Sequence, residues 1–134
     1  MASSLKKLPK FTLGVEEEYQ IIDPETRDLR SHMSKIVEGG KITLKEQVKA
    51  EMHQSVVEVG TNICENVSEA RKEVSSLRNK IAELAANQDL VVGAASTHPL
   101  ARWQDQEITD DPRYHTIVDE LKDIDRSNLL FCFV

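Results

Sequence analysis

Residues 11–22 read FTLGVEEEYQII, and this stretch decides the fold around which the rest of the chain is arranged. Side chains of a β-strand point alternately to its two faces, so a strand here places Glu16 and Glu18 side by side on one face. The opposite face carries Phe11, Leu13, Val15, Tyr19 and Ile21. Glu17 interrupts that apolar face. We therefore expect a strand with one apolar and one acidic face.

The acidic face of this strand is a candidate metal site. Neighbouring carboxylates such as those of Glu16 and Glu18 repel each other, and a cation between them relieves the repulsion. Carboxylate oxygens are also the ligands that suit Mg²⁺ and Mn²⁺. The alternative is a solvated acidic face on an edge strand, which needs no ion.

Composition limits the classes of function. With 134 residues, of which 40% are hydrophobic, the chain is long enough for one domain with a buried core. Its formal net charge of −6 argues against nucleic-acid binding and against docking on an anionic membrane. Cys64 and Cys132 lack metal-type spacing, which favours a reducing cytoplasm. We expect neither a signal peptide nor a membrane-spanning run in these residues. We expect residues 1–10 to be a flexible arm and residues 11–134 to be one domain.

A second acidic stretch, VKAEMHQSVVEVGT, occupies residues 48–61. The valines of residues 56–59 favour a strand. Glu51 and Glu58 are seven residues apart, so an uninterrupted strand would point them to opposite faces. They can share a site only if the chain bends between them, and we expect that bend at residues 53–55.

Two helices are indicated by their start signals and apolar spacing. Asn66 caps the longer one, and Glu69 completes a capping-box pattern. The shorter helix begins at Pro112 after the cap Asp111. We expect the charged side chains of the longer helix to be solvated. Its expected buried stripe is Val67, Ala70, Val74, Leu77, Ile81, Leu84 and Ala85.

Shorter runs complete the expected sheet. Residues 33–37 suit a single helical turn that Gly39-Gly40 ends. Residues 90–96, LVVGAAS, are small and apolar on both faces, which is typical of a central strand. Their glycine and alanines allow a helix or a ligand to approach closely. Residues 128–134, NLLFCFV, read as a further apolar strand.

Polar residues that follow the 90–96 strand form another candidate site. Thr97 and His98 lie where a buried strand ends, a common place for binding residues, although a lone histidine there is more often a satisfied structural residue. Arg113 lies in the first turn of a helix, where its charge opposes the helix dipole. It could anchor a carboxylate or phosphate there, or be an ordinary exposed arginine.

Several stretches together resemble one known family. They are TLGVEEEYQIID at 12–23, EMHQSVVEVGTNIC at 51–64, EAR at 69–71, ASTHPLARWQDQEIT at 95–109 and RY at 113–114. In their order and spacing, the chain resembles the N-terminal third of the bacterial carboxylate–amine ligases related to glutamate–cysteine ligase (family two).

The resemblance implies an α+β, glutamine-synthetase-like fold, incomplete in this chain, with a mostly antiparallel sheet and helices packed on one face. It implies an ATP-dependent ligase that joins glutamate, or a similar acid, to an amine such as cysteine through an acyl phosphate, with Mg²⁺ or Mn²⁺ clamping the ATP phosphates. It implies a cytoplasmic homo-oligomer with small-molecule substrates. The implied metal ligands are Glu16, Glu18, Glu51 and Glu58, beside Gly14. The implied substrate contacts are Thr97, His98, Arg113 and Tyr114.

Two alternatives stay open at this point. The family's strand that corresponds to residues 128–134 runs into a histidine-containing motif that is absent here. The chain could therefore be a truncated, non-catalytic domain that acts through oligomerisation or metal binding. It could also be a small α+β domain with an acidic surface and no site.

Overall fold

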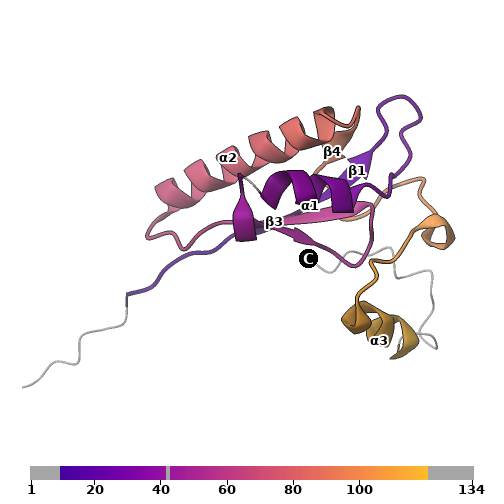
Figure 1. The fold of residues 1–134 in the computed structure, drawn as a ribbon. Helices are drawn as coiled ribbons and strands as arrows, with labels where there is room; N and C mark the ends of the chain where they lie inside the picture. Colours follow the sequence, from indigo (N-terminus) through magenta and orange to yellow (C-terminus); the bar gives the residue numbers. More distant parts are fainter. Residues whose placement is uncertain (1–9, 42, 121–134) are drawn as a thin grey trace, which may run out of the picture.

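The computed structural model describes residues 10–41 and 43–120, and within them one four-stranded antiparallel sheet carries the fold (Figure 1). The strand order is β2-β3-β1-β4. The strands are β1 (Glu16–Ile22), β2 (Val48–Ala50), β3 (Val56–Gly60) and β4 (Val91–Gly93). The helices are α1 (Met33–Lys41), α2 (Val67–Ala86) and α3 (Pro112–Glu120), with short 3₁₀ turns η1 (Lys45–Gln47) and η2 (Trp103–Asp105). The predicted α+β class with an antiparallel sheet is confirmed, and the glutamine-synthetase-like assignment stays a prediction.

The strand predicted at residues 11–22 is confirmed in its second half only. β1 starts at Glu16, where its ladder with β3 begins opposite Gly60. Before that point the chain makes one isolated bridge, from Leu13 to Cys64, and Val15 exchanges hydrogen bonds with Thr61. The early residues lack a regular ladder because β3 ends at Gly60.

Helices α1 and α2 lie on the same side of the sheet (Figure 1). The alternation predicted for β1 holds, since Tyr19 and Ile21 are buried on this side. The core is made of Tyr19, Ile21, Met33, Ile36, Leu44, Val48, Val57, Val59, Leu77, Ile81, Ala85 and Leu90. One face of the sheet is therefore filled by helices, and the opposite face is left for polar residues.

The cap of α2 is as predicted. Asn66 accepts a hydrogen bond from the Glu69 amide through its side chain, at 3.0 Å. The Glu69 carboxylate reaches back to the amide of Glu65, one residue before the cap. The buried stripe begins at Ala70, because Val67 in the first turn is 70% exposed.

The prediction that Gly39 and Gly40 end a single helical turn is wrong, since α1 continues through both to Lys41. The glycines permit close packing instead. A Cβ on Gly40 would lie 2.8 Å from Cγ1 of Val48, and a Cβ on Gly39 would lie 3.2 Å from Cδ2 of Leu84. α1 therefore sits tight against β2 and α2.

The run at 90–96 forms a shorter strand than predicted, and in a different place. Within the described part of the chain, β4 pairs with β1 alone, so it is an edge strand there and not a central one. The expected close approach does occur, because a Cβ on Gly93 would lie 2.8 Å from Cδ1 of Ile22. The strand expected at 128–134, and the arm up to residue 9, lie outside the described residues.

The prediction that the charged side chains of α2 are simply solvated is wrong for Arg78. Arg78 forms an ion pair with Glu17 and also hydrogen bonds to the hydroxyl of Tyr19. The hydrogen bond from Arg78 lowers the pKa of Glu17. Burial and the adjacent Glu17 carboxylate raise the pKa of Tyr19 to about 12. Glu17, which interrupts the apolar face of β1, is thus neutralised by Arg78 of the covering helix α2.

No helix among the described residues combines the length and the apolar character that crossing a membrane requires.

A candidate metal centre on the acidic face

The sheet face opposite α1 and α2 carries charged side chains from three neighbouring strands. Glu18 of β1 and Lys49 of β2 both pair with Glu58 of β3 in the strand register. Because Tyr19 and Val57 point into the core, alternation turns Glu18 and Glu58 to the other face. A row of charges therefore runs across the sheet.

Glu51 joins this row because β2 and β3 form a hairpin. The chain turns at residues 54–55, within the predicted bend, and returns antiparallel as β3. Glu51 and Glu58 thus lie on opposite sides of a hairpin turn, and not on one uninterrupted strand. Glu51 follows Lys49 by two residues and comes to the same face. Ligand oxygens of Glu18, Glu51 and Glu58 lie within 4.8 Å of one another, and all three residues are half-buried.

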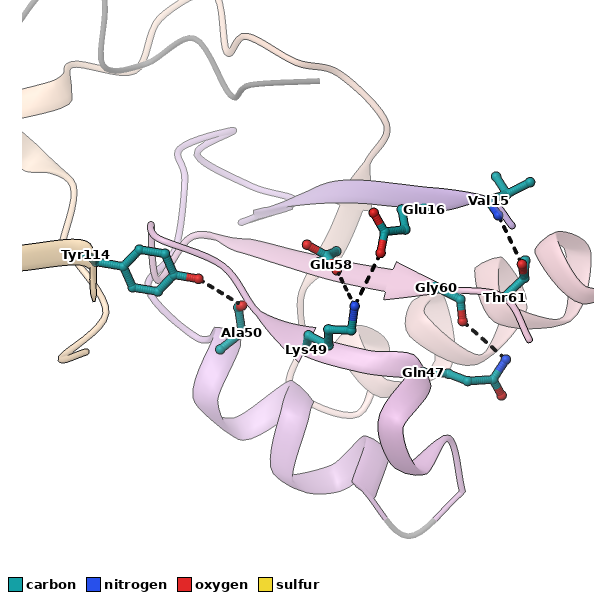
Figure 2. Close-up of polar contacts among 9 residues, drawn as sticks. All are labelled: Val15, Glu16, Gln47, Lys49, Ala50, Glu58, Gly60, Thr61 and Tyr114. Atoms are coloured by element: carbon teal, nitrogen blue, oxygen red, sulfur yellow. Dashed lines mark hydrogen bonds and ion pairs between the residues drawn. The ribbon is translucent and has the colours of Figure 1, made fainter. Parts of the chain in front are cut away.

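The segment 107–114 holds the backbone of Glu51 in place. The hydroxyl of Thr109 donates to the Glu51 carbonyl at 2.6 Å, and the Thr109 amide donates to the Met52 carbonyl at 2.7 Å. The hydroxyl of Tyr114 donates to the carbonyl of Ala50 at 3.3 Å (Figure 2). Thr109 was not among the predicted site residues, because its role depends on a long-range pairing that the sequence does not show.

Glu16 does not belong to the trio of Glu18, Glu51 and Glu58. Figure 2 shows the Lys49 ammonium between Glu16 and Glu58, with its nitrogen 3.3 Å from Oε1 of Glu16 and 3.0 Å from Oε1 of Glu58. Hydrogen bonds to Glu58 and then to Glu16 raise the pKa of Lys49. Lys49 was not among the predicted site residues, because only the strand register places it opposite Glu58.

Two cavities meet at Glu16. One of about 350 Å³ lies between the carboxylates of Glu16, Glu18 and Glu58 and the segment 94–96. The other, of about 410 Å³, is lined by Gly14, Val15, Glu16, Glu46, Gln47, Lys49, Gly60, Thr61 and Asn62. A Cβ on Gly14 would meet nothing within 4 Å, so this side is open.

The donor set of the trio fits a hard divalent cation. Three carboxylate oxygens are ligands of the type that Mg²⁺ and Mn²⁺ select over softer metals. Octahedral Mg²⁺ holds its oxygens at about 2.1 Å, which puts neighbouring ligands roughly 3–4 Å apart. The present separation of up to 4.8 Å closes to that range by small side-chain rotations. Glu18, Glu51 and Glu58 could therefore hold such an ion without movement of the sheet.

His98 has a structural role in this fold. Its Nε2 lies 2.9 Å from the carbonyl of Arg27, and its Nδ1 accepts from the amides of Leu100 and Ala101. Since Nδ1 is an acceptor, Nε2 carries the proton and donates a hydrogen bond to the Arg27 carbonyl. Both ring nitrogens of this buried side chain are used by the backbone, so the geometry does not support the expected substrate contact. Thr97 beside it is exposed.

Arg113 and Tyr114 form one unit at the start of α3. The helix begins at Pro112 as predicted, and Asp111 accepts from the amide of Arg113 at 2.8 Å. The guanidinium of Arg113 lies over the Tyr114 ring, 4.5 Å from its centroid, and donates to its hydroxyl. Burial, followed by the charge of Glu51, raises the pKa of Tyr114. Tyr114 is therefore near the trio, and its hydroxyl supports the hairpin through the carbonyl of Ala50.

Known proteins match the chain over nearly its whole length. The family model described as "Glutamate-cysteine ligase family 2(GCS2)" matches residues 12–130. A protein of Solibacter usitatus, named "Putative glutamate--cysteine ligase 2", is 53% identical over 124 residues, which are 92% of this chain and 32% of that protein. A protein of the same name from Chloroflexus aurantiacus is 56% identical over 121 residues, 90% of this chain and 31% of its own. The chain thus spans about a third of the length of these curated relatives.

Proposed function

The chain belongs to glutamate–cysteine ligase family 2, and we propose that it supplies the divalent-metal site of an ATP-dependent carboxylate–amine ligase. In the proposed reaction, ATP transfers its terminal phosphoryl group to the γ-carboxylate of glutamate or a similar acid. An amine, such as that of cysteine, then attacks the acyl phosphate, forms the amide bond and releases phosphate. We place this reaction in the cytoplasm, with small molecules as substrates.

The observation that carries the proposal is the convergence of three half-buried carboxylates on one sheet face. The trio of Glu18, Glu51 and Glu58 concentrates negative charge beside a cavity of about 350 Å³, a size that suits a small-molecule ligand. Alone, that charge would repel both ATP and an acidic substrate. A Mg²⁺ or Mn²⁺ ion would invert the local field and neutralise charge on the transferred phosphoryl group.

The residues around the trio suit a fixed site. Glu18 and Glu58 lie on adjacent, hydrogen-bonded strands, so their backbones hold a constant spacing. Glu51 leaves the ladder, but Thr109 anchors its carbonyl. Ligands placed on rigid elements pay less ordering entropy when an ion binds.

Metal titration tests the proposal directly. We expect Mg²⁺ and Mn²⁺ to bind the chain in calorimetric titrations, with Mn²⁺ also followed by electron paramagnetic resonance. Glu18→Gln and Glu58→Gln should each weaken binding by about tenfold or more, because each removes one charged ligand. Glu25→Gln, at an exposed turn position away from the trio, is the matched control and should bind as the unchanged protein does.

Activity is measured in the natural protein as its own cell produces it. We expect release of phosphate from ATP that requires a divalent ion, an acid and an amine together, and that Glu18→Gln abolishes. If the titrations show no binding, or binding that neither glutamate substitution changes, the metal site is wrongly assigned. If metal binds but no acid–amine pair stimulates phosphate release, the ligase assignment is wrong.

A further inference from the structure

Lys49 places a positive charge on the acidic face. Its ammonium lies between Glu58, a member of the trio, and Glu16, which stands outside it (Figure 2). The strand register fixes this position, because Lys49 and Glu58 are direct cross-strand partners. One oxygen of a prospective metal ligand is therefore already engaged by a cation that belongs to the chain itself.

We propose that Lys49 is a built-in counter-ion that competes with the divalent cation for Glu58 and so sets the metal affinity of the site. This inference rests on the proposed function, since it assumes that the trio of Glu18, Glu51 and Glu58 holds the ion. In this proposal Lys49 is a positioning residue that acts through Glu58. Glu16 binds the Lys49 ammonium and is not itself a metal ligand.

Charge explains why the competition is real. The carboxylates of Glu16, Glu18, Glu51 and Glu58 carry four negative charges, which Lys49 reduces to three. A divalent ion on the trio would lie within a few ångströms of the ammonium, and like charges at such distances oppose binding. The ion must therefore displace the ammonium from Glu58 or bind beside it at a cost.

The Lys49 ammonium has room to move away from Glu58 when an ion binds. The Lys49 side chain is 51% exposed, whereas that of Glu58 is 18% exposed, so the lysine is the partner that can move. It also lines the open cavity of about 410 Å³ together with Gly14 and Gly60. Glu16, whose side chain is 68% exposed, lines the same cavity and can keep the ammonium close after Glu58 turns to the metal.

Three lysine variants of the chain test this by Mg²⁺ titration. Removing the competing charge in Lys49→Met should tighten Mg²⁺ binding by about tenfold, from the repulsion of two cations a few ångströms apart under partial solvent screening. Lys49→Arg keeps the charge and should bind Mg²⁺ as the unchanged protein does. Lys80→Met removes a lysine from another surface ion pair, with Glu83 on α2, and should change nothing.

Thermal unfolding gives a second readout. Without metal, Lys49→Met should melt at a lower temperature than the unchanged protein, because the carboxylates lose their counter-ion. Added Mg²⁺ should raise its melting temperature by more than it raises that of the unchanged protein.

The possible outcomes separate the two proposals. Equal or weaker Mg²⁺ binding in Lys49→Met, with Glu58→Gln still impaired, overturns the role of Lys49 and leaves the metal site intact. Binding seen only in Lys49→Met supports the competition in its strongest form. If neither protein binds Mg²⁺, the trio is not a metal site, and both proposals fail together.

Discussion

Asp23 shows how much one carboxylate can organise. Its Oδ1 accepts from the amides of Glu25 and Thr26, and its Oδ2 accepts from the guanidinium of Arg30. The Thr26 amide and then Arg30 lower the pKa of Asp23 to about 2. The turn after β1 is thus held by an ionised side chain.

This gives a prediction for acid stability. A carboxyl group whose pKa is lower in the folded state stabilises the fold above its unfolded pKa, and that stabilisation is lost as the pH falls towards its folded pKa. Asp23 should therefore contribute to a fall in melting temperature between about pH 4 and about pH 2, and Asp23→Asn should remove that contribution. Asp28→Asn, exposed in the same turn, is the control. Curves of melting temperature against pH that stay parallel for Asp23→Asn and the unchanged protein would contradict the assignment.

Helix α1 offers a matched pair of glycines for testing how elements pack. A methyl group on Gly40 would meet Val48 at 2.8 Å, and one on Gly39 would meet the end of the Leu84 side chain at 3.2 Å. Alanine favours a helix over glycine by up to about 1 kcal/mol at either position. Overpacking at Gly40 should outweigh that gain, with a net destabilisation of about 1–2 kcal/mol.

Urea unfolding of Gly39→Ala and Gly40→Ala measures the difference. The gain in helix propensity is similar for both, so the comparison isolates the contact with β2. Gly39→Ala should be neutral or slightly stabilising, because the end of the flexible Leu84 side chain can move by a few tenths of an ångström. Equal stability of the two variants would mean that α1 does not depend on close approach to β2.

The protein as a whole shows which features sequence reasoning can reach. Local rules predicted the two faces of β1, the Asn66 cap and the start of α3 at Pro112, since each depends on neighbours within a few residues. Long-range pairing decides the rest. Nothing local places Lys49 opposite Glu58 or Arg78 over Glu17.

The candidate site divides along the same line. The sequence was enough to predict the acidic candidates on their strands. It also showed that Glu51 and Glu58 can share a site only if the chain bends between them. The sequence could not predict which three of the four carboxylates converge. Glu16 and Glu18 look equivalent until the register with β3 is known. His98 looked like a binding residue for a similar reason, since its backbone partners Arg27, Leu100 and Ala101 are invisible without the fold.

Glu51 connects the site to the stability of the fold, and this gives the last prediction. In a metal chelator, Glu51→Gln should be more stable than the unchanged protein by roughly 0.5 kcal/mol, because it relieves repulsion within the trio. In saturating Mg²⁺ the order should reverse. An ion present at a hundred times its dissociation constant adds about 2.7 kcal/mol to the free energy of unfolding of the protein that binds it, and less to that of a variant with a missing ligand.

Urea unfolding with chelator and with Mg²⁺ measures both states, and Glu38→Gln on the exposed side of α1 should follow the unchanged protein in each. A Glu51→Gln variant that keeps the same rank in both conditions would show that the carboxylates repel each other without ever sharing an ion.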